Sequence, residues 1–123
     1  MYNNSVKLRI TLLGIALVTG VTARAGEKST VTGWVIDSAC TYTKNLTKPI
    51  GAECAKKCAT AGSPLVILAD DGIIYLPIDK VLPASSQNRK LIKFAGERVT
   101  VRGEVFTHGG SKAIAIEEIQ APK

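Results

Sequence analysis

Alternating and continuous apolar runs in the first half of the chain predict three β-strands. Residues 30–37 (TVTGWVID) are rich in β-branched and aromatic side chains, and Gly33 within them indicates a bulge or a close backbone contact. Residues 65–69 (LVILA) and 73–77 (IIYLP) flank the sequence Asp70-Asp71-Gly72. Asp-Gly between two apolar runs is a strong turn signal, because glycine accepts a positive φ at little cost. These two runs therefore predict a β-hairpin.

The second half of the chain predicts a short helix followed by two more strands. Residues 86–95 (SQNRKLIKFA) favour a helix that ends at Gly96. In residues 98–106 (RVTVRGEVF), valines alternate with polar side chains, which is typical of a strand with one buried face. Residues 112–119 (KAIAIEEI) predict the last strand, and its final isoleucine is out of phase with the others. This change of phase indicates a β-bulge near Glu117.

Between the first and second strands the pattern changes to that of a helix. Residues 41–48 are polar and predict a loop. Residues 49–62 (PIGAECAKKCATAG) combine a proline start, frequent alanine and a glycine stop, which together favour a helix. Four side chains of this helix would align on one stripe: Ile50, Cys54, Cys58 and Ala61. We therefore expect both helix cysteines to face the surface on which the helix packs.

This order of elements predicts a mainly β fold. Five strands with a short helix between the third and fourth match the OB-like β-barrel, and the cysteine-bearing helix is then an insertion between the first and second strands. An open α+β sheet is the alternative. Residues 26–123 are expected to form one domain, whose hydrophobic core is modest at this length.

Residues 1–25 have the three parts of a secretory signal peptide. Lys7 and Arg9 precede the apolar run ITLLGIALVTGV, and a small-x-small site ends at Ala25. The run is shorter than the ~20 apolar residues that a membrane span needs. We therefore expect cleavage between Ala25 and Gly26, a periplasmic or secreted location, and no stable membrane anchor after cleavage.

The charge balance argues against nucleic acid as a partner. The whole chain has 16 basic and 10 acidic residues, a formal net charge of +6. Loss of Lys7, Arg9 and Arg24 with the leader would leave 13 basic and 10 acidic residues, a net charge of +3. This excess is small, and the chain has few of the aromatic residues on which bases stack. The sequence itself identifies no other partner.

Three cysteines carry the candidate chemistry. In an exported chain, a disulfide from Cys40 to Cys54 or Cys58 would close a loop and fix the inserted helix to the end of the first strand. Alternatively, the three thiolates could hold copper(I) or zinc, with Asp37 as a fourth ligand, because soft thiolates select these metals. A third alternative is thiol redox chemistry, since a helix N-terminus favours a thiolate. The only histidine, His108, lies far away in the sequence and is expected in an exposed turn.

The cysteine pattern and its surroundings resemble a group of small secreted bacterial proteins that have no assigned function. The matching segments are 33–40 (GWVIDSAC), 53–58 (ECAKKC), Gly62, the apolar hairpin and 95–103 (AGERVTVRG). The resemblance spans most of residues 26–123. This chain departs from the group at Thr41, where glycine is frequent, and it has no histidine between Cys40 and Cys54.

A non-enzymatic binding or interaction domain is the function that these observations favour, without a cofactor. A single histidine supports no Ser-His-Asp site, and no other catalytic constellation is present. The ligand is not identified by the sequence. The alternatives are a periplasmic copper(I) or zinc protein that uses Cys40, Cys54 and Cys58, and a thiol-redox protein.

Overall fold

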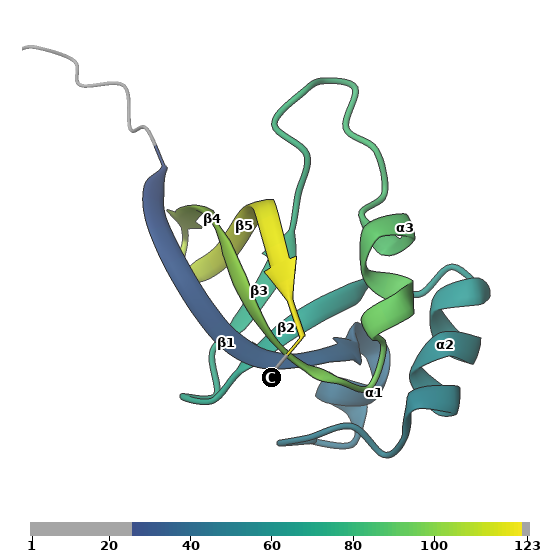
Figure 1. Ribbon diagram of the computed structural model, residues 1–123. Coiled ribbons are helices and arrows are strands. Elements are labelled where there is room, and N and C mark those ends of the chain that lie inside the picture. Colours follow the sequence, from purple (N-terminus) through teal and green to yellow (C-terminus); the bar gives the residue numbers. More distant parts are fainter. Residues whose placement is uncertain (1–25, 122–123) are drawn as a thin grey trace, which may run out of the picture.

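Five strands close a barrel in the computed structural model, which describes residues 26–121 (Figure 1). The strands are β1 (Glu27–Asp37), β2 (Leu65–Ala69), β3 (Ile74–Pro77), β4 (Arg98–His108) and β5 (Ser111–Gln120). Their order around the barrel is β1-β2-β3-β5-β4, and only β3 and β5 pair in parallel. The prediction of a five-stranded OB-like barrel is confirmed, and the alternative of an open sheet is wrong.

The predicted signal peptide, with its cleavage site at Ala25, lies outside the described residues. Within residues 26–121, no helix has the length and apolar character needed to cross a membrane.

Helices occur at the two places where the sequence predicts them. Between β1 and β2 lie α1 (Ser38–Thr43) and α2 (Ala52–Thr60); between β3 and β4 lie α3 (Asn88–Leu91) and the short 3-10 helix η1 (Ile92–Phe94). In Figure 1, α1 and α2 lie together beside the end of β1. The sequence predicts a loop at residues 41–48, where the second half of α1 forms, so α1 is the one helix of the described residues that was not expected.

Two local irregularities of the strands agree with the sequence. A Cβ atom on Gly33 would clash with the carbonyl oxygen of Leu68, so glycine allows β1 and β2 to approach closely. On β5, Glu118 pairs with Arg102 and Ile116 pairs with Gly103, which leaves Glu117 as the extra residue of a bulge. Both predictions are confirmed.

The hydrophobic core fills the barrel and continues outside it on one side. Val35, Ile67, Val99, Val101 and Ile114 point into the barrel and are fully buried, together with Leu91 from α3. A second cluster, formed by Ile36, Val66 and Leu68, lies on the opposite face of β1 and β2, where Leu46 and Ile74 pack against it. Both faces of β2 are therefore covered, as its continuous apolar sequence indicates.

Candidate metal centre

The three cysteines converge in space although 18 residues separate the first from the last. Their sulfur atoms all lie within 4.8 Å of one another, and each cysteine is half-buried. Cys40 comes from α1, and Cys54 and Cys58 come from α2. The expectation that the end of the first strand and the inserted helix bring these sulfurs together is confirmed.

Asp37, the last residue of β1, fixes the position of Cys40. Its backbone is extended, and its Oδ1 accepts a hydrogen bond of 2.7 Å from the backbone N–H of Cys40. This is the arrangement of a helix N-cap, which satisfies an amide that has no partner within the helix. The carbonyl of Asp37 also accepts from the hydroxyl of Thr41 at 2.6 Å. The cap therefore starts α1 directly after the strand and places Cys40 in its first turn.

Cys54 and Cys58 lie one turn apart on α2. Their sulfurs are on the side of the helix that faces Cys40 of α1. The residues that α2 buries against the core are Ala55 and Ala59. The prediction that Cys54 and Cys58 lie on the packing face of this helix is therefore wrong, because the buried residues are the ones that follow them, Ala55 and Ala59. Small alanine side chains let the helix approach the barrel closely, and this rotation leaves the neighbouring cysteines at the rim of the contact.

Two residues that no sequence pattern marks connect α1, α2 and α3. The Ser63 hydroxyl donates a hydrogen bond to Oδ2 of Asp37. The Asn88 side chain donates to the carbonyl of Ser63 at 2.9 Å and accepts from the N–H of Leu65 at 2.9 Å. The residues after α2 are thus held against the cap of α1. A serine after a helix-ending glycine is a weak sequence signal, and Asn88 carries none.

The ionisation of Cys40 and Asp37 reflects their contact. A hydrogen bond to the Asp37 carboxylate, burial and the nearby negative charge raise the pKa of the Cys40 thiol to about 11. Burial alone would raise the pKa of Asp37, but hydrogen bonds from Ser63 and from Cys40 outweigh it and lower that pKa. Cys40 is therefore protonated at neutral pH, which argues against its use as an attacking thiolate.

The separations of the sulfurs fit a metal site better than a disulfide. A disulfide bond is about 2.05 Å long, and all three cysteines are free. The predicted disulfide from Cys40 to Cys54 or Cys58 therefore has no support in the structure. Three sulfurs at about 2.3 Å from a central metal in one plane lie about 4.0 Å apart. The cluster would have to contract by less than about 1 Å to reach that geometry.

The structure does not bring a fourth protein ligand to the cluster among residues 26–121. Asp37 is almost fully buried, but both of its oxygens accept hydrogen bonds and it is outside the group of converging ligand atoms. His108 ends β4 and is exposed in the β4–β5 hairpin, as expected, and it also lies outside the group. Asp37 therefore positions a cysteine instead of completing a ligand set.

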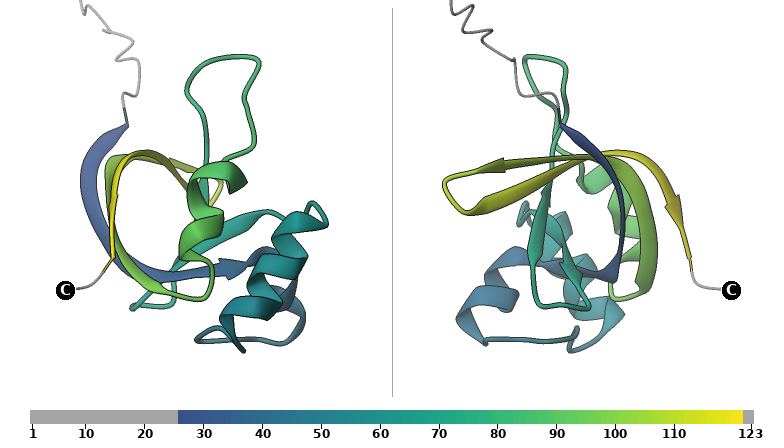
Figure 2. Two further views of the ribbon diagram at one scale, coloured as in Figure 1. Left: turned by 45° about the vertical axis from the view of Figure 1, so that its right-hand side comes forward. Right: turned by 90° about the vertical axis from the view of Figure 1, so that its left-hand side faces the viewer.

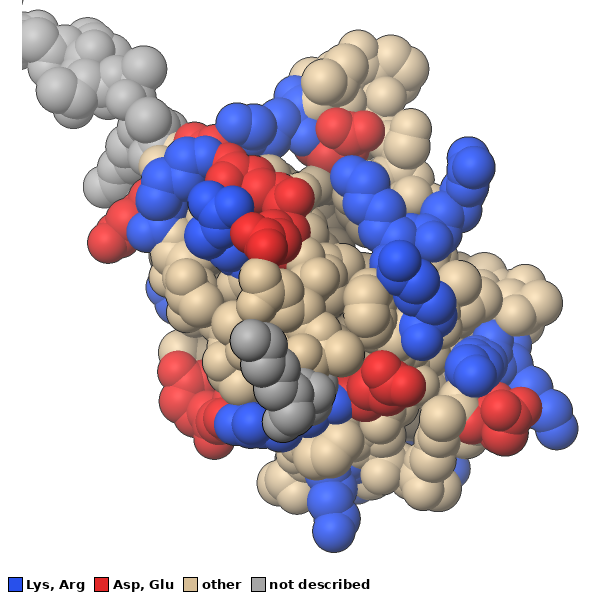
Figure 3. Space-filling view, viewed as in Figure 1, with Lys and Arg blue, Asp and Glu red and all other residues tan. Residues whose placement is uncertain are grey.

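The surroundings of the cluster are apolar on one side and charged on the other. Beside Cys40 and Cys54 is a small cavity of about 10 Å³, close to the least that one water molecule needs. Its wall is mostly apolar and includes Ile36, Leu46, Pro49 and Ile50. The outer face of α2 carries Glu53 and Lys56, whose charged atoms are 3.8 Å apart, and Figure 3 shows both charge signs over this helix.

No protein-family model, no curated protein and no solved structure matches this chain.

Proposed function

We propose that this protein binds a single copper(I) ion through Cys40, Cys54 and Cys58. The observation that carries the proposal is the convergence of three free cysteine sulfurs within 4.8 Å, contributed by two separate helices. Thiolates are soft ligands and select copper(I) and zinc from the common metal ions. This is the alternative that the sequence analysis gives beside the favoured binding or interaction domain held by a disulfide.

Copper(I) suits three sulfurs better than zinc does at this site. Structural zinc is almost always held by four ligands in a tetrahedron. Here each oxygen of the Asp37 carboxylate already accepts a hydrogen bond, from Cys40 or Ser63, and Asp37 is outside the group of converging ligand atoms. Three thiolates in an apolar setting instead match the low coordination number of copper(I). Half-burial of the cysteines leaves a path for the ion to enter and leave.

The leader supports a role outside the cytoplasm. If the chain is exported, the cysteines work where disulfides persist, and a bound soft metal would keep the three thiols from oxidising. Binding would also connect α1 to α2, which adds stability in the way that the predicted disulfide would have done. We infer that the site serves to hold or carry the ion and does not act as a catalytic centre.

The test is a competitive titration of the reduced protein with copper(I) in the absence of oxygen, against a chromophoric copper(I) chelator. We expect one ion per chain. Cys40→Ser, Cys54→Ser and Cys58→Ser should each weaken binding at least tenfold, while His108→Asn, which removes the only histidine, should leave it unchanged. Circular dichroism of each variant checks that the fold is retained, since serine is close to cysteine in size.

Three results would overturn the proposal. The first is copper(I) binding that survives all three serine substitutions. The second is a zinc complex that forms with one ion per chain while copper(I) fails to compete with the chelator. The third is a purified protein whose mass is about 2 Da below the reduced mass and that has one alkylatable thiol, because this result would instead support the disulfide.

A further inference from the structure

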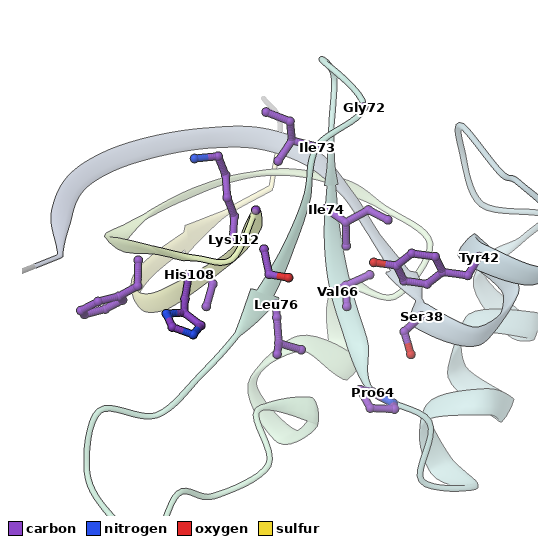
Figure 4. A pocket seen from close by; sticks show the side chains of 14 residues that line it. Ser38, Tyr42, Pro64, Val66, Gly72, Ile73, Ile74, Leu76, His108 and Lys112 are labelled. Carbon is purple, nitrogen blue, oxygen red and sulfur yellow. The ribbon is translucent and has the colours of Figure 1, made fainter.

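A groove of about 630 Å³ lies between α1, the β2–β3 hairpin and the β4–β5 hairpin (Figure 4). Val66, Ile74 and Leu76 form a row along it. Lys112 is the one charged residue of its lining within residues 26–121, and its ammonium points away from this row and donates to the hydroxyl of Thr107. The lining of this groove therefore selects no particular ligand.

A second groove lies between the C-terminal half of β5 and the helical segment that joins β3 to β4. It has a volume of about 360 Å³, and none of its lining residues belongs to the cysteine cluster. One wall comes from α3 and η1, and the other from residues 116–119 of β5. In Figure 3 the surface is hollowed here, between negative side chains over β5 and positive side chains over α3.

The groove follows the edge of β5 and does not lie over one of its faces. Successive side chains of a strand point to opposite faces, and here four consecutive residues of β5 line the groove. No residue of β4, the neighbour of β5 on its other side, belongs to the lining. The wall that β5 offers is therefore the edge that faces away from β4.

The backbone of β5 is unpaired along this edge. β5 pairs with β4 over residues 111–120, but with β3 only over residues 112–114. The carbonyl of Ile114 accepts a hydrogen bond of 2.9 Å from the N–H of Ile78, so it points away from β4. Because the backbone groups of a strand alternate in direction, those of Ile116 point the same way and have no backbone partner within residues 26–121. The right-hand view of Figure 2 shows this half of β5 with a strand on one side only.

The wall opposite this edge carries three positive charges. Arg89, Lys90 and Lys93 are exposed, and Lys93 follows the other two by three and four residues, so that the three lie on one face. None of them forms an ion pair with a carboxylate within residues 26–121. The ammonium of Lys93 lies 5.0 Å from the centre of the Phe94 ring, which itself lines the groove. This contact keeps a positive charge at the groove.

The acids on the wall of β5 already have partners. Glu117 forms ion pairs with Lys28 and with Arg102, whose Nη1 is 3.9 Å from its Oε2. Glu118 accepts a hydrogen bond of 2.7 Å from Arg102. The three unpaired cations of the opposite wall therefore leave the groove with an excess of positive charge. The other lining side chains are apolar: Phe94, Ile116 and Ile119.

We propose that this groove binds an extended acidic segment of a partner protein, which adds to the open edge of β5 as a further strand. The edge selects an extended polypeptide, because a backbone offers N–H and C=O groups in the alternation that a strand requires. Carboxylates of the segment pair with Arg89, Lys90 and Lys93, and its apolar side chains lie on Phe94 and Ile116. The bulge at Glu117 interrupts the edge, so the pairing is short and the complex exchanges readily. This site is independent of the copper(I) site.

The test measures the binding of three capped, rhodamine-labelled hexapeptides by fluorescence anisotropy. The acidic peptide alternates valine with aspartate, and its neutral counterpart alternates valine with asparagine. The third peptide has the acidic sequence with every backbone amide N-methylated, which keeps its charge but removes the N–H groups that pair with a strand. We expect the neutral peptide to bind roughly tenfold more weakly than the acidic one, and the methylated peptide at least about tenfold more weakly.

Substitutions in the protein test the charged wall. The triple variant Arg89→Gln, Lys90→Gln, Lys93→Gln should weaken binding of the acidic peptide roughly tenfold, as the loss of three exposed ion pairs predicts, and should leave the neutral peptide unchanged. The matched control replaces three exposed lysines that lie outside the groove and also lack an ion pair within residues 26–121: Lys44→Gln, Lys48→Gln and Lys57→Gln. The control should change the binding of neither peptide.

Backbone amide shifts in NMR spectra locate the acidic peptide, and they should move at Lys93, Ile116 and Ile119. The proposal is overturned if this peptide fails to bind at millimolar concentration, or if the two triple variants lose the same affinity. Equal binding of the methylated peptide would also overturn it, because the groove would then attract anions in general. A dimer that pairs β5 with β5 in sedimentation and NMR experiments, and that the peptide fails to dissociate, would assign the edge to a second copy of this chain and overturn it as well.

Discussion

Replacement of Asp37 by alanine tests how the cysteine cluster is held in place. The carboxylate of Asp37 is 1% exposed and accepts from the backbone N–H of Cys40 and the hydroxyl of Ser63. Asp37→Ala removes both acceptors while the two donors remain. The variant should therefore lose the start of α1 and the connection between α1 and the end of α2.

The expected loss of stability follows from the two hydrogen bonds. Removal of a helix N-cap costs about 1 kcal/mol. Loss of a hydrogen bond to a charged group in a buried place costs about 1.5–3 kcal/mol. The sum, roughly 2.5–4 kcal/mol, is a large part of the ~5–15 kcal/mol by which a domain is stable. The variant should fold, but with a markedly lower free energy of unfolding.

Urea denaturation of the metal-free protein, followed by circular dichroism, measures this difference. The matched control is Asp71→Ala. Asp71 also accepts a local backbone hydrogen bond, from Ile73 at 3.0 Å, but it is exposed, so its loss should cost less than about 0.5 kcal/mol. Asp37→Asn keeps one side-chain acceptor, so its loss of unfolding free energy should lie between the losses of Asp37→Ala and Asp71→Ala.

The pH dependence gives a second readout. Because hydrogen bonds hold the pKa of Asp37 below its ordinary value, the stability that its charge contributes is complete above about pH 4. That contribution disappears as the pH falls through the folded pKa. The difference in the free energy of unfolding between the wild type and Asp37→Asn should therefore become smaller below about pH 4. If Asp37→Ala is as stable as Asp71→Ala, the capping role assigned to Asp37 is refuted.

Three further predictions concern the thiol, the strands and the core. Alkylation of Cys40 by iodoacetamide, followed by peptide mass spectrometry, should rise with pH up to about 11, and Asp37→Asn should speed it roughly tenfold or more at pH 8. Gly33→Ala should lower the free energy of unfolding measured in urea by about 1–3 kcal/mol, because the new Cβ meets the carbonyl of Leu68. Leu91→Ala should lower the free energy of unfolding by about 2–5 kcal/mol, because its side chain is fully buried in the core.

Each of these predictions has a control and a contradicting result. An alkylation rate at Cys40 that levels off between about pH 9 and 10 in the wild type would show that its pKa is not raised above the ordinary value of 9.0. Gly51→Ala is the control for Gly33, because nothing lies within 4 Å of a Cβ there, and an equal effect of the two would contradict the close approach of β1 and β2. A loss below about 1 kcal/mol for Leu91→Ala would mean that α3 does not close the core.

The elements of the barrel could be predicted because their signals are local. The hairpin follows from Asp-Gly between apolar runs, and the bulge at Glu117 follows from a change of phase within a few residues. Even the close approach at Gly33 is marked by the one residue that permits it. Each of these features depends on the conformation of neighbouring residues, so the order of residues is enough to indicate it.

The metal centre could be predicted only in part. The sequence indicates that Cys40 leaves the first strand near a helix with two cysteines, and their convergence is confirmed. It does not indicate α1, whose capping residue is held by Ser63, 26 residues further along the chain. It also assigns the cysteines to the packing face of α2, which belongs to Ala55 and Ala59. Rotation of a helix about its axis is decided by the surface that it meets.

What the sequence alone determined is therefore the set of strands, their turns and the insertion that carries the thiols. The tertiary structure decided which side chains share a site. The sulfurs of Cys40, Cys54 and Cys58 converge because α2 packs on the core through Ala55 and Ala59 while the hydrogen bonds of Asp37 with Cys40 and Ser63 hold α1 beside it. Contacts between residues far apart in the chain depend on that packing, and no local pattern encodes them.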